Sequence, residues 1–133
     1  MADLIDRQLL DAGLTLLRAD PALVVYPDVE GQVPATPEPP YVRVYGAVGR
    51  PPGPGNALDG LSRQLTARWW CHCVGTTEPA ALAVAMRVRV ALLDARINGG
   101  MVRQEVGDQP PVRDETTGVP VYDVVAVYRL ISY

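Results

Sequence analysis

Residues 121–133 of this 133-residue chain read VYDVVAVYRLISY, and they predict a long strand. Apolar side chains fall on both of its sides: Val121, Val125, Val127 and Ile131 on one, and Tyr122, Val124, Ala126, Tyr128 and Leu130 on the other. A strand with a helix on one face and water on the other alternates between apolar and polar residues. Because this strand hardly alternates, we expect its second face to be covered as well, by another copy of the chain.

A long apolar helix precedes that strand. The start signal TTEP at residues 76–79 predicts a helix from Pro79 to Ile97, which Asn98-Gly99-Gly100 is expected to end. Apolar residues surround most of its circumference, and such a helix is more buried than the surface helix of a small domain. We therefore expect a neighbouring subunit on its outer side, with Val90 as a candidate contact residue.

The rest of the chain supplies one more helix and four more strands. Spacings of three and four between apolar residues predict an amphipathic helix from Ala2 to Arg18. The predicted strands lie at residues 22–26, 41–46, 62–74 and 101–106, with a proline-rich connector at 27–40. The order α-β-β-β-α-β-β predicts a single α+β domain over residues 1–133. It has a mixed or antiparallel sheet of about four to five strands, with both helices on one face.

The amino-acid composition limits the classes of protein to which this chain can belong. The chain is 48% apolar, which suits a folded domain with a core of its own. It contains no run of about 18 apolar residues, so we expect no membrane-spanning helix. The opening MADLIDRQLLDAG lacks the basic region of a signal peptide, so we expect synthesis in a cytoplasm. All twelve basic residues are Arg and there is no Phe, which indicates a GC-rich genome.

The charges are unevenly distributed along the chain. Residues 1–40 hold seven acids and two Arg, whereas residues 41–105 hold eight Arg and four acids, within a net charge of −3. A simple nucleic-acid binder shows a net basic footprint, which this chain lacks. The pattern is compatible with oppositely charged surfaces that meet across a repeated interface.

One short motif, Cys71-His72-Cys73, invites a metal or catalytic interpretation. Structural zinc needs four ligands, and these are the only Cys and His residues of the chain. On a strand the two cysteines share one face and His72 points to the other, so the three side chains cannot meet at one metal ion or catalytic site. Residues 46–60 are glycine-rich but lack the lysine of a phosphate loop. We predict no catalytic residues, no metal, no cofactor and no enzymatic activity.

Residues 47–60 and 107–120 are predicted to be two long polar loops, and loops beyond about 12 residues are usually functional or disordered. We expect them to be contact arms, with Arg50 and Arg113 as anchors because guanidinium groups make bidentate contacts. Asp114 is a further interface candidate. The alternative is that both loops are merely solvated. Trp70, in the third predicted strand, is a candidate contact because tryptophan in a long strand favours core or interface.

The element order, the size and the two long loops resemble the tail terminator proteins of long-tailed bacteriophages, also called tail-completion or head–tail joining proteins. The matching segments are LIDRQLLDAGLTLLRA, YVRVYG, QLTARWWCHCVG, EPAALAVAMRVRVALLDARI and VYDVVAVYRLISY. That family has no catalytic motif, so the resemblance lies in the organisation of the chain.

The resemblance implies a virion protein at the head-proximal end of the tail, in a ring that is usually a hexamer. The ring caps the tail tube, ends its polymerisation and presents a surface to the head connector. DNA passes through its lumen without sequence-specific binding, and no membrane is involved. Two alternatives stay open: another head-completion or minor capsid protein of the connector region, and a small nucleic-acid-binding module that uses Arg68 and the two tryptophans.

Overall fold

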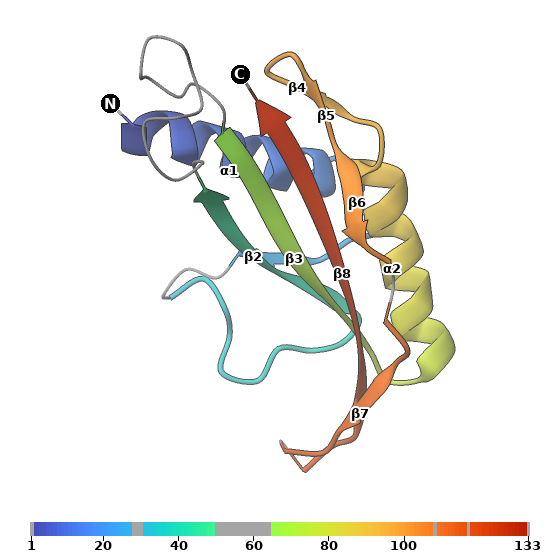
Figure 1. Cartoon of the computed structure of the whole chain (residues 1–133). Helices are drawn as coiled ribbons and strands as arrows, with labels where there is room; N and C mark the ends of the chain where they lie inside the picture. The colour runs from blue at the N-terminus through green and yellow to red at the C-terminus, as the bar shows by residue number, and fades with distance from the viewer. Residues whose placement is uncertain (1, 28–30, 50–64, 108, 117, 133) are drawn as a thin grey trace, which may run out of the picture.

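The computed structural model describes residues 2–27, 31–49, 65–107, 109–116 and 118–132. Its two helices are α1 (Ala2–Arg18) and α2 (Glu78–Leu92), shown in Figure 1. Its strands are β1 (Val25–Pro27), β2 (Tyr41–Gly49), β3 (Leu65–Gly75), β4 (Arg96–Ile97), β5 (Gly100–Met101), β6 (Arg103–Val106), β7 (Val112–Asp114) and β8 (Val121–Ser132).

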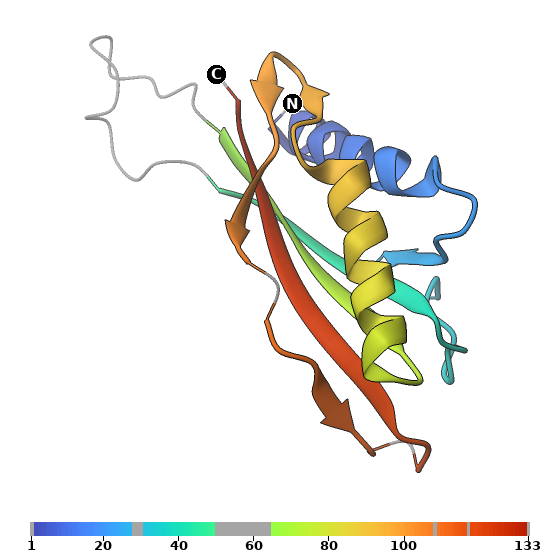
Figure 2. The same cartoon turned by 90° about the vertical axis from the view of Figure 1, so that its right-hand side faces the viewer.

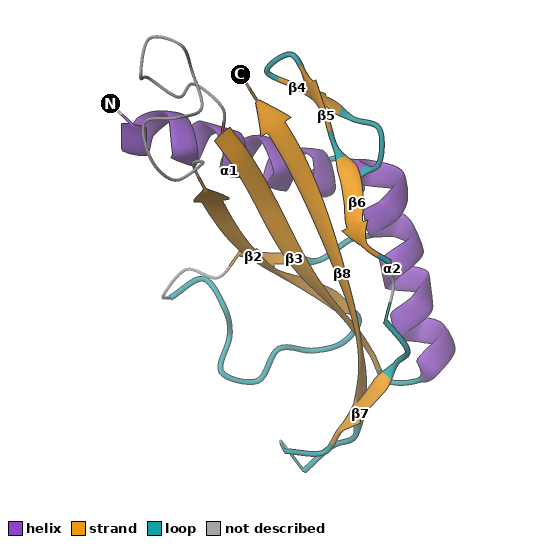
Figure 3. Ribbon diagram, viewed as in Figure 1, coloured by secondary structure: helices purple, strands orange, loops and turns teal. Residues whose placement is uncertain are grey.

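Six strands form one mixed sheet in the order β1-β2-β3-β8-β6, with β7 paired to β8 (Figure 3). The pairing of β1 with β2 is parallel and the other pairings in this sheet are antiparallel. Strands β4 and β5 form a separate hairpin. Both helices lie on the same face of the sheet (Figure 2). The predicted α+β class and helix placement are confirmed, although the sheet has more strands than expected.

The predicted end of the second helix is wrong. The helix begins as expected, with the Thr77 side chain accepting a hydrogen bond from the Ala80 N–H at 3.2 Å. It ends at Leu92, five residues early, and Asp94 adopts φ 63°. Asn98 and Gly99, at φ 49° and 82°, form the turn of the β4–β5 hairpin instead of a helix cap. Both residues tolerate left-handed backbone, so the same signal serves hairpins and helix ends.

The two predicted loops also need correction. Strand β2 continues to Gly49, so residues 47–49 belong to the sheet, and residues 50–60 lie outside the described residues. Within residues 107–120 the segment Val112–Asp114 is a strand that pairs with residues 121–123 of β8. Three residues without apolar alternation give no strand signal of their own. This strand forms because the long β8 offers it hydrogen-bonding partners.

The core lies between the sheet and the two helices. Strand β3 contributes Ala67, Trp69, Cys71 and Cys73, and the facing residues of β8 are Leu130, Tyr128, Ala126 and Val124 in the same register. Helix α2 closes this layer with Ala81, Ala85, Val88 and Leu92. All of these side chains are fully buried. Trp69 and Trp70 lie on opposite faces of β3, as the two-residue period of a strand predicts.

Helix α1 lies unusually close to the sheet at Gly13. The indole N–H of Trp69 donates a hydrogen bond to the Leu10 carbonyl at 3.2 Å, and Trp69 is fully buried. A Cβ atom on Gly13 would lie only 2.5 Å from the indole ring. Glycine at this position therefore lets the helix pack directly on the tryptophan.

Gly13→Ala is expected to destabilise the protein although alanine is the better helix former. The helical gain of about 0.5–1 kcal/mol is smaller than the roughly 1–3 kcal/mol cost of overpacking a core. Urea unfolding followed by circular dichroism measures the sign. The control is Thr15→Ala on the exposed side of α1, which should be neutral or stabilising. A Gly13→Ala variant more stable than the parent would show that α1 moves away from Trp69 at little cost.

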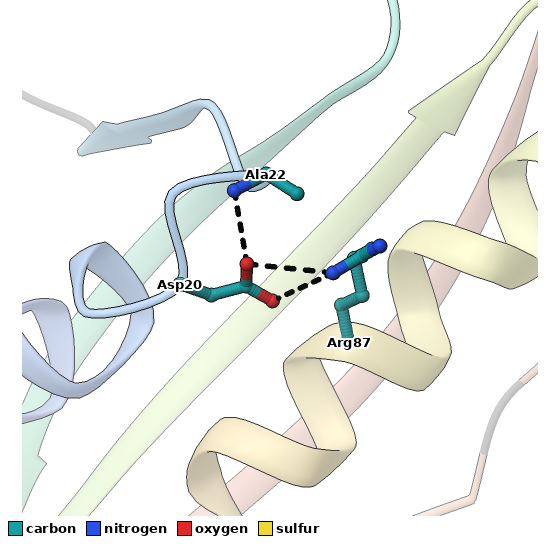
Figure 4. Close-up of polar contacts among 3 residues, drawn as sticks. All are labelled: Asp20, Ala22 and Arg87. Atoms are coloured by element: carbon teal, nitrogen blue, oxygen red, sulfur yellow. Dashed lines mark hydrogen bonds and ion pairs between the residues drawn. The ribbon is translucent and has the colours of Figure 1, made fainter.

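The turn that follows α1 is fastened to α2 by Asp20 (Figure 4). Its carboxylate accepts a hydrogen bond from the Ala22 N–H at 2.9 Å and lies 3.1 Å from the Arg87 guanidinium. The Ala22 hydrogen bond, with a further contribution from Arg87, lowers the pKa of Asp20. This contact therefore stabilises the fold at neutral pH, and its contribution is lost as the pH falls through that lowered pKa.

Candidate interaction surfaces

The outer side of α2 carries an exposed apolar stripe. Leu82, Met86 and Val90 are spaced four residues apart, so they lie in line on one face of the helix. Their exposed fractions are 44%, 60% and 79%. We call these three residues the α2 stripe. Val90 lies on the outer side of α2, as expected. Leu82 and Met86 directly follow the buried Ala81 and Ala85, and this spacing predicts that they widen the buried stripe, a prediction that is wrong.

The second surface is the sheet face away from the helices, which we call the open face (Figure 2). Alternation and register place on it residues 41, 43 and 45 of β2, residues 68, 70 and 72 of β3, and residues 123, 125, 127 and 129 of β8. Most of these residues are half-buried although no described helix crosses this face. Arg43 shares one face of β2 with Tyr41 and Tyr45, as the two-residue period of a strand predicts.

Apolar side chains cross the open face in a single row. Tyr45 is paired with Trp70, Trp70 with Val127, and Val127 with Val106, so the row spans four neighbouring strands. Val106 at its end is 39% exposed, Trp70 and Tyr45 are half-buried, and Val127 is buried at 6% exposure. We call these four residues the apolar row.

Two side-chain pairs lie beside the apolar row. His72 Nδ1 lies 3.0 Å from Asp123 Oδ2, and the Tyr45 ring meets the His72 ring edge-on at 5.3 Å. On the other side of the row, Arg68 makes a two-pronged contact with the Glu105 carboxylate at 2.7 and 3.2 Å. Their mutual hydrogen bonds lower the pKa of Glu105 and raise that of Arg68. The contact with Glu105 engages the Arg68 guanidinium, which the nucleic-acid alternative would use.

The cysteine-histidine motif is divided between the two faces of the sheet, as predicted. Cys71 and Cys73 are fully buried on the helix side, and His72 lies on the open face. Burial raises the pKa of the Cys71 thiol to about 12, so it carries almost no thiolate at neutral pH. Over the described ranges, no cluster of three or more Cys, His, Asp or Glu side chains is arranged to hold a metal ion.

The structure does not gather the predicted contact residues into one site. Val90 is on the helix layer and Trp70 on the open face. Arg113 and Asp114 lie in β7, where Arg113 pairs with Glu115 at 2.7 Å. Asp114 accepts hydrogen bonds from the N–H and hydroxyl of Thr116, and these lower its pKa. Both residues hold a local turn, and Arg50 lies outside the described residues.

A hollow between α1 and β2 was not foreseen from the sequence. It has a volume of about 420 Å³ and is bounded by one side of the helix and by the strand at Val44, Tyr45 and Gly46. No sequence motif marks it, because it depends on where α1 sits relative to the strand.

Comparison with protein-family models finds no matching family, and comparison with curated proteins finds no matching sequence. In the part of the chain that the structure describes, no helix is long and apolar enough to span a membrane. The surfaces above are therefore the basis for a functional assignment.

Proposed function

We propose that this chain is a structural virion protein that forms a ring at the head-proximal end of a phage tail. In this role the ring ends polymerisation of the tail tube and provides the joining surface to the head connector. The observation that carries the proposal is the presence of two different apolar surfaces, the α2 stripe and the apolar row. They lie on opposite sides of a molecule made of one helix layer and one sheet.

A contact between two different patches is heterologous. Such contacts place subunits head to tail, and they produce a ring when the rotation between neighbours closes. If a patch instead contacted the same patch on a second subunit, the result would be a twofold dimer in which the other patch stays uncovered. Repeated head-to-tail contacts cover both patches in every subunit.

The dimensions of the two patches agree. From Leu82 to Val90 the α2 stripe extends roughly 12 Å, at a rise of about 1.5 Å per residue. The apolar row crosses four strands, a distance of roughly 14 Å at about 4.8 Å per strand spacing. The α2 stripe of one subunit is therefore long enough to lie along the row of the next.

Two further points support the proposal. The element order begins α-β-β-β-α-β, like the order on which the resemblance to tail terminators rests, although more strands follow α2 than that order contains. The pairing of Arg68 with Glu105 and of His72 with Asp123 favours a protein partner for the open face over stacked bases. The proposed partners are other copies in a hexamer, the tail-tube protein and the head-completion or connector protein. DNA passes through the lumen, and the proposal involves no cofactor, enzymatic activity or membrane.

The mass of the purified protein, alone and mixed with its tail-tube protein, tests this function. We expect a species near six times the 14.3 kDa chain mass in at least the mixture, and rings in negative-stain electron micrographs. A protein that stays monomeric in both samples, or that forms only a twofold dimer, would contradict the ring. Light scattering coupled to size exclusion separates these outcomes.

A further inference from the structure

Three arginines lie opposite one another on the open face. Arg68 of β3 is paired with Arg129 of β8, and Arg129 is paired with Arg103 of β6. Directly paired residues share a face of the sheet, so the three side chains lie on the same side, two residues along β8 from Val127 of the apolar row. We call these three residues the arginine row. Because like charges directly opposite one another destabilise a sheet, the arginine row needs compensating carboxylates.

Two carboxylates compensate the ends of the arginine row. Glu105 holds Arg68 at 2.7 and 3.2 Å, and the Asp94 carboxylate lies 2.8 Å from the Arg103 guanidinium. Over the described ranges, the half-buried Arg129 between them has no side-chain hydrogen bond or ion pair of its own. The Arg68 hydrogen bond, with a smaller contribution from the charge of Arg129, lowers the pKa of Glu105. Three guanidinium groups therefore share two carboxylates, and the excess positive charge lies at the centre of the row.

The α2 stripe leads to a carboxylate. Glu78, the first residue of α2, lies four residues before Leu82 and is therefore in line with the stripe. Its side chain is exposed, and the part of the chain that the structure describes gives it no hydrogen-bonding or ionic partner. Near the other end of the helix, the exposed Arg89 lies next to Val90. The outer side of α2 is thus negative at its N-terminal end and positive near its C-terminal end.

We propose that Glu78 of one subunit pairs with Arg129 of the next, with the N-terminal end of α2 over β8 and β6. The pairing rests on the ring contact proposed above and adds to it the direction in which α2 crosses the neighbouring sheet. Glu78 lies roughly 6 Å beyond Leu82 along the helix, and Arg129 lies roughly 7 Å beyond Val127 along β8. With Leu82 seated on Val127, the two charged residues are about 9 Å apart in the plane of the sheet. A glutamate and an arginine side chain together span that gap.

Charge disfavours the reverse direction of the helix. It would place Arg89 beside the arginine row, where the excess charge is already positive. In the proposed direction Arg89 lies over β2, whose open face carries one arginine, Arg43, instead of three. Like charges brought together at an interface penalise the wrong arrangement. Charge complementarity therefore selects one of the two directions that apolar contacts alone would allow.

Charge reversal tests the pairing. Glu78→Arg and Arg129→Glu should each weaken the subunit contact about tenfold, which is about 1.4 kcal/mol. Both changes in one chain should restore most of the loss. Sedimentation velocity over a concentration series measures the dissociation, in the sample, pure or mixed with the tail-tube protein, in which the parent assembles. Glu38→Arg is the control, because it makes the same change at an exposed carboxylate outside α2, and it should assemble as the parent does.

The neutral variants Glu78→Gln and Arg129→Gln separate assembly from folding. Circular dichroism should show the parent's fold in both, and each should weaken assembly less than the matching charge reversal does. Assembly unchanged in both reversals, or a double variant no better than the single ones, would overturn the pairing. If Val90→Asp abolishes the ring while the reversals leave it unchanged, the ring contact stands and the pairing alone fails. A parent that never assembles overturns both.

Nucleic acid is the other occupant that an arginine row could take. Fluorescein-labelled oligothymidylate is titrated with the parent and with Arg129→Glu, at low and high salt, and followed by fluorescence anisotropy. We expect no difference between the two proteins, because the proposed partner of Arg129 is a carboxylate. Salt-dependent binding that Arg129→Glu loses would assign the arginine row to phosphates and overturn the proposal.

Discussion

Replacing Trp69 with alanine is expected to lower the free energy of unfolding by about 3–5 kcal/mol, the usual cost of removing a large buried aromatic side chain. Trp69 is fully buried beneath α1, is paired with Tyr128 of the neighbouring strand β8, and donates a hydrogen bond from its indole N–H to the Leu10 carbonyl. The truncation leaves a cavity and an acceptor without its donor. Urea unfolding monitored by far-ultraviolet circular dichroism gives the difference.

The next residue in the chain supplies the matched control. Trp70→Ala removes the same atoms from the other face of the same strand, where the side chain is only half-buried. Its cost should be less than half that of Trp69→Ala, because little new cavity forms. If the open face contacts a neighbour, Trp70→Ala should weaken assembly instead. Equal destabilisation by the two variants would mean that the open face is covered within the monomer.

The sequence predicted those elements whose signals are local and repeated. Helix α1 has the expected bounds because its apolar stripe is regular and Asp20-Pro21 follows it. The faces of Cys71, His72 and Cys73 follow from the two-residue period of a strand and are as predicted. In both cases the local pattern and the tertiary packing favour the same conformation.

Elements that depend on a partner elsewhere in the chain were missed. Nothing in Val112–Asp114 identifies it as a strand, because its pairing with β8 decides it. Asn98-Gly99 gives a turn signal that fits a helix end and a hairpin equally well, and only the β4–β5 pairing selects the hairpin. The hollow between α1 and β2 is another such feature, since Gly13 sets how close the helix comes to the sheet.

Apolarity in a sequence does not say which molecule covers a residue. Helical spacing alone groups Leu82 and Met86 with Ala81 and Ala85 on the buried side of α2. Ala81 and Ala85 are fully buried within the chain, while Leu82 and Met86 are exposed. Nearly all-round apolarity therefore combines two stripes in this helix: one packs on the sheet of its own chain, and the other is exposed. An apolar surface of this kind in a monomer is typical of an interaction site.

Val90→Asp tests that second stripe and should impair assembly more than stability. With 79% of Val90 exposed, the fold loses little by the change. A carboxylate in the last turn of the helix opposes its dipole and costs about 0.3–1 kcal/mol. If a neighbouring subunit buries this carboxylate and offers it no hydrogen-bonding or ionic partner, the cost is roughly 2–4 kcal/mol for each subunit contact. Each subunit contact should therefore weaken by about 30- to 1,000-fold.

Light scattering at matched concentrations should show the ring replaced by smaller species, while thermal unfolding shifts by only a few degrees. Val24→Asp is the control, because it makes the same change at a valine that is 45% exposed on a different part of the surface. It should leave assembly intact. If Val90→Asp assembles as the parent does, α2 is not at the subunit contact. Loss of assembly in both variants would instead mean that the effect of the added carboxylate is not specific to the α2 stripe.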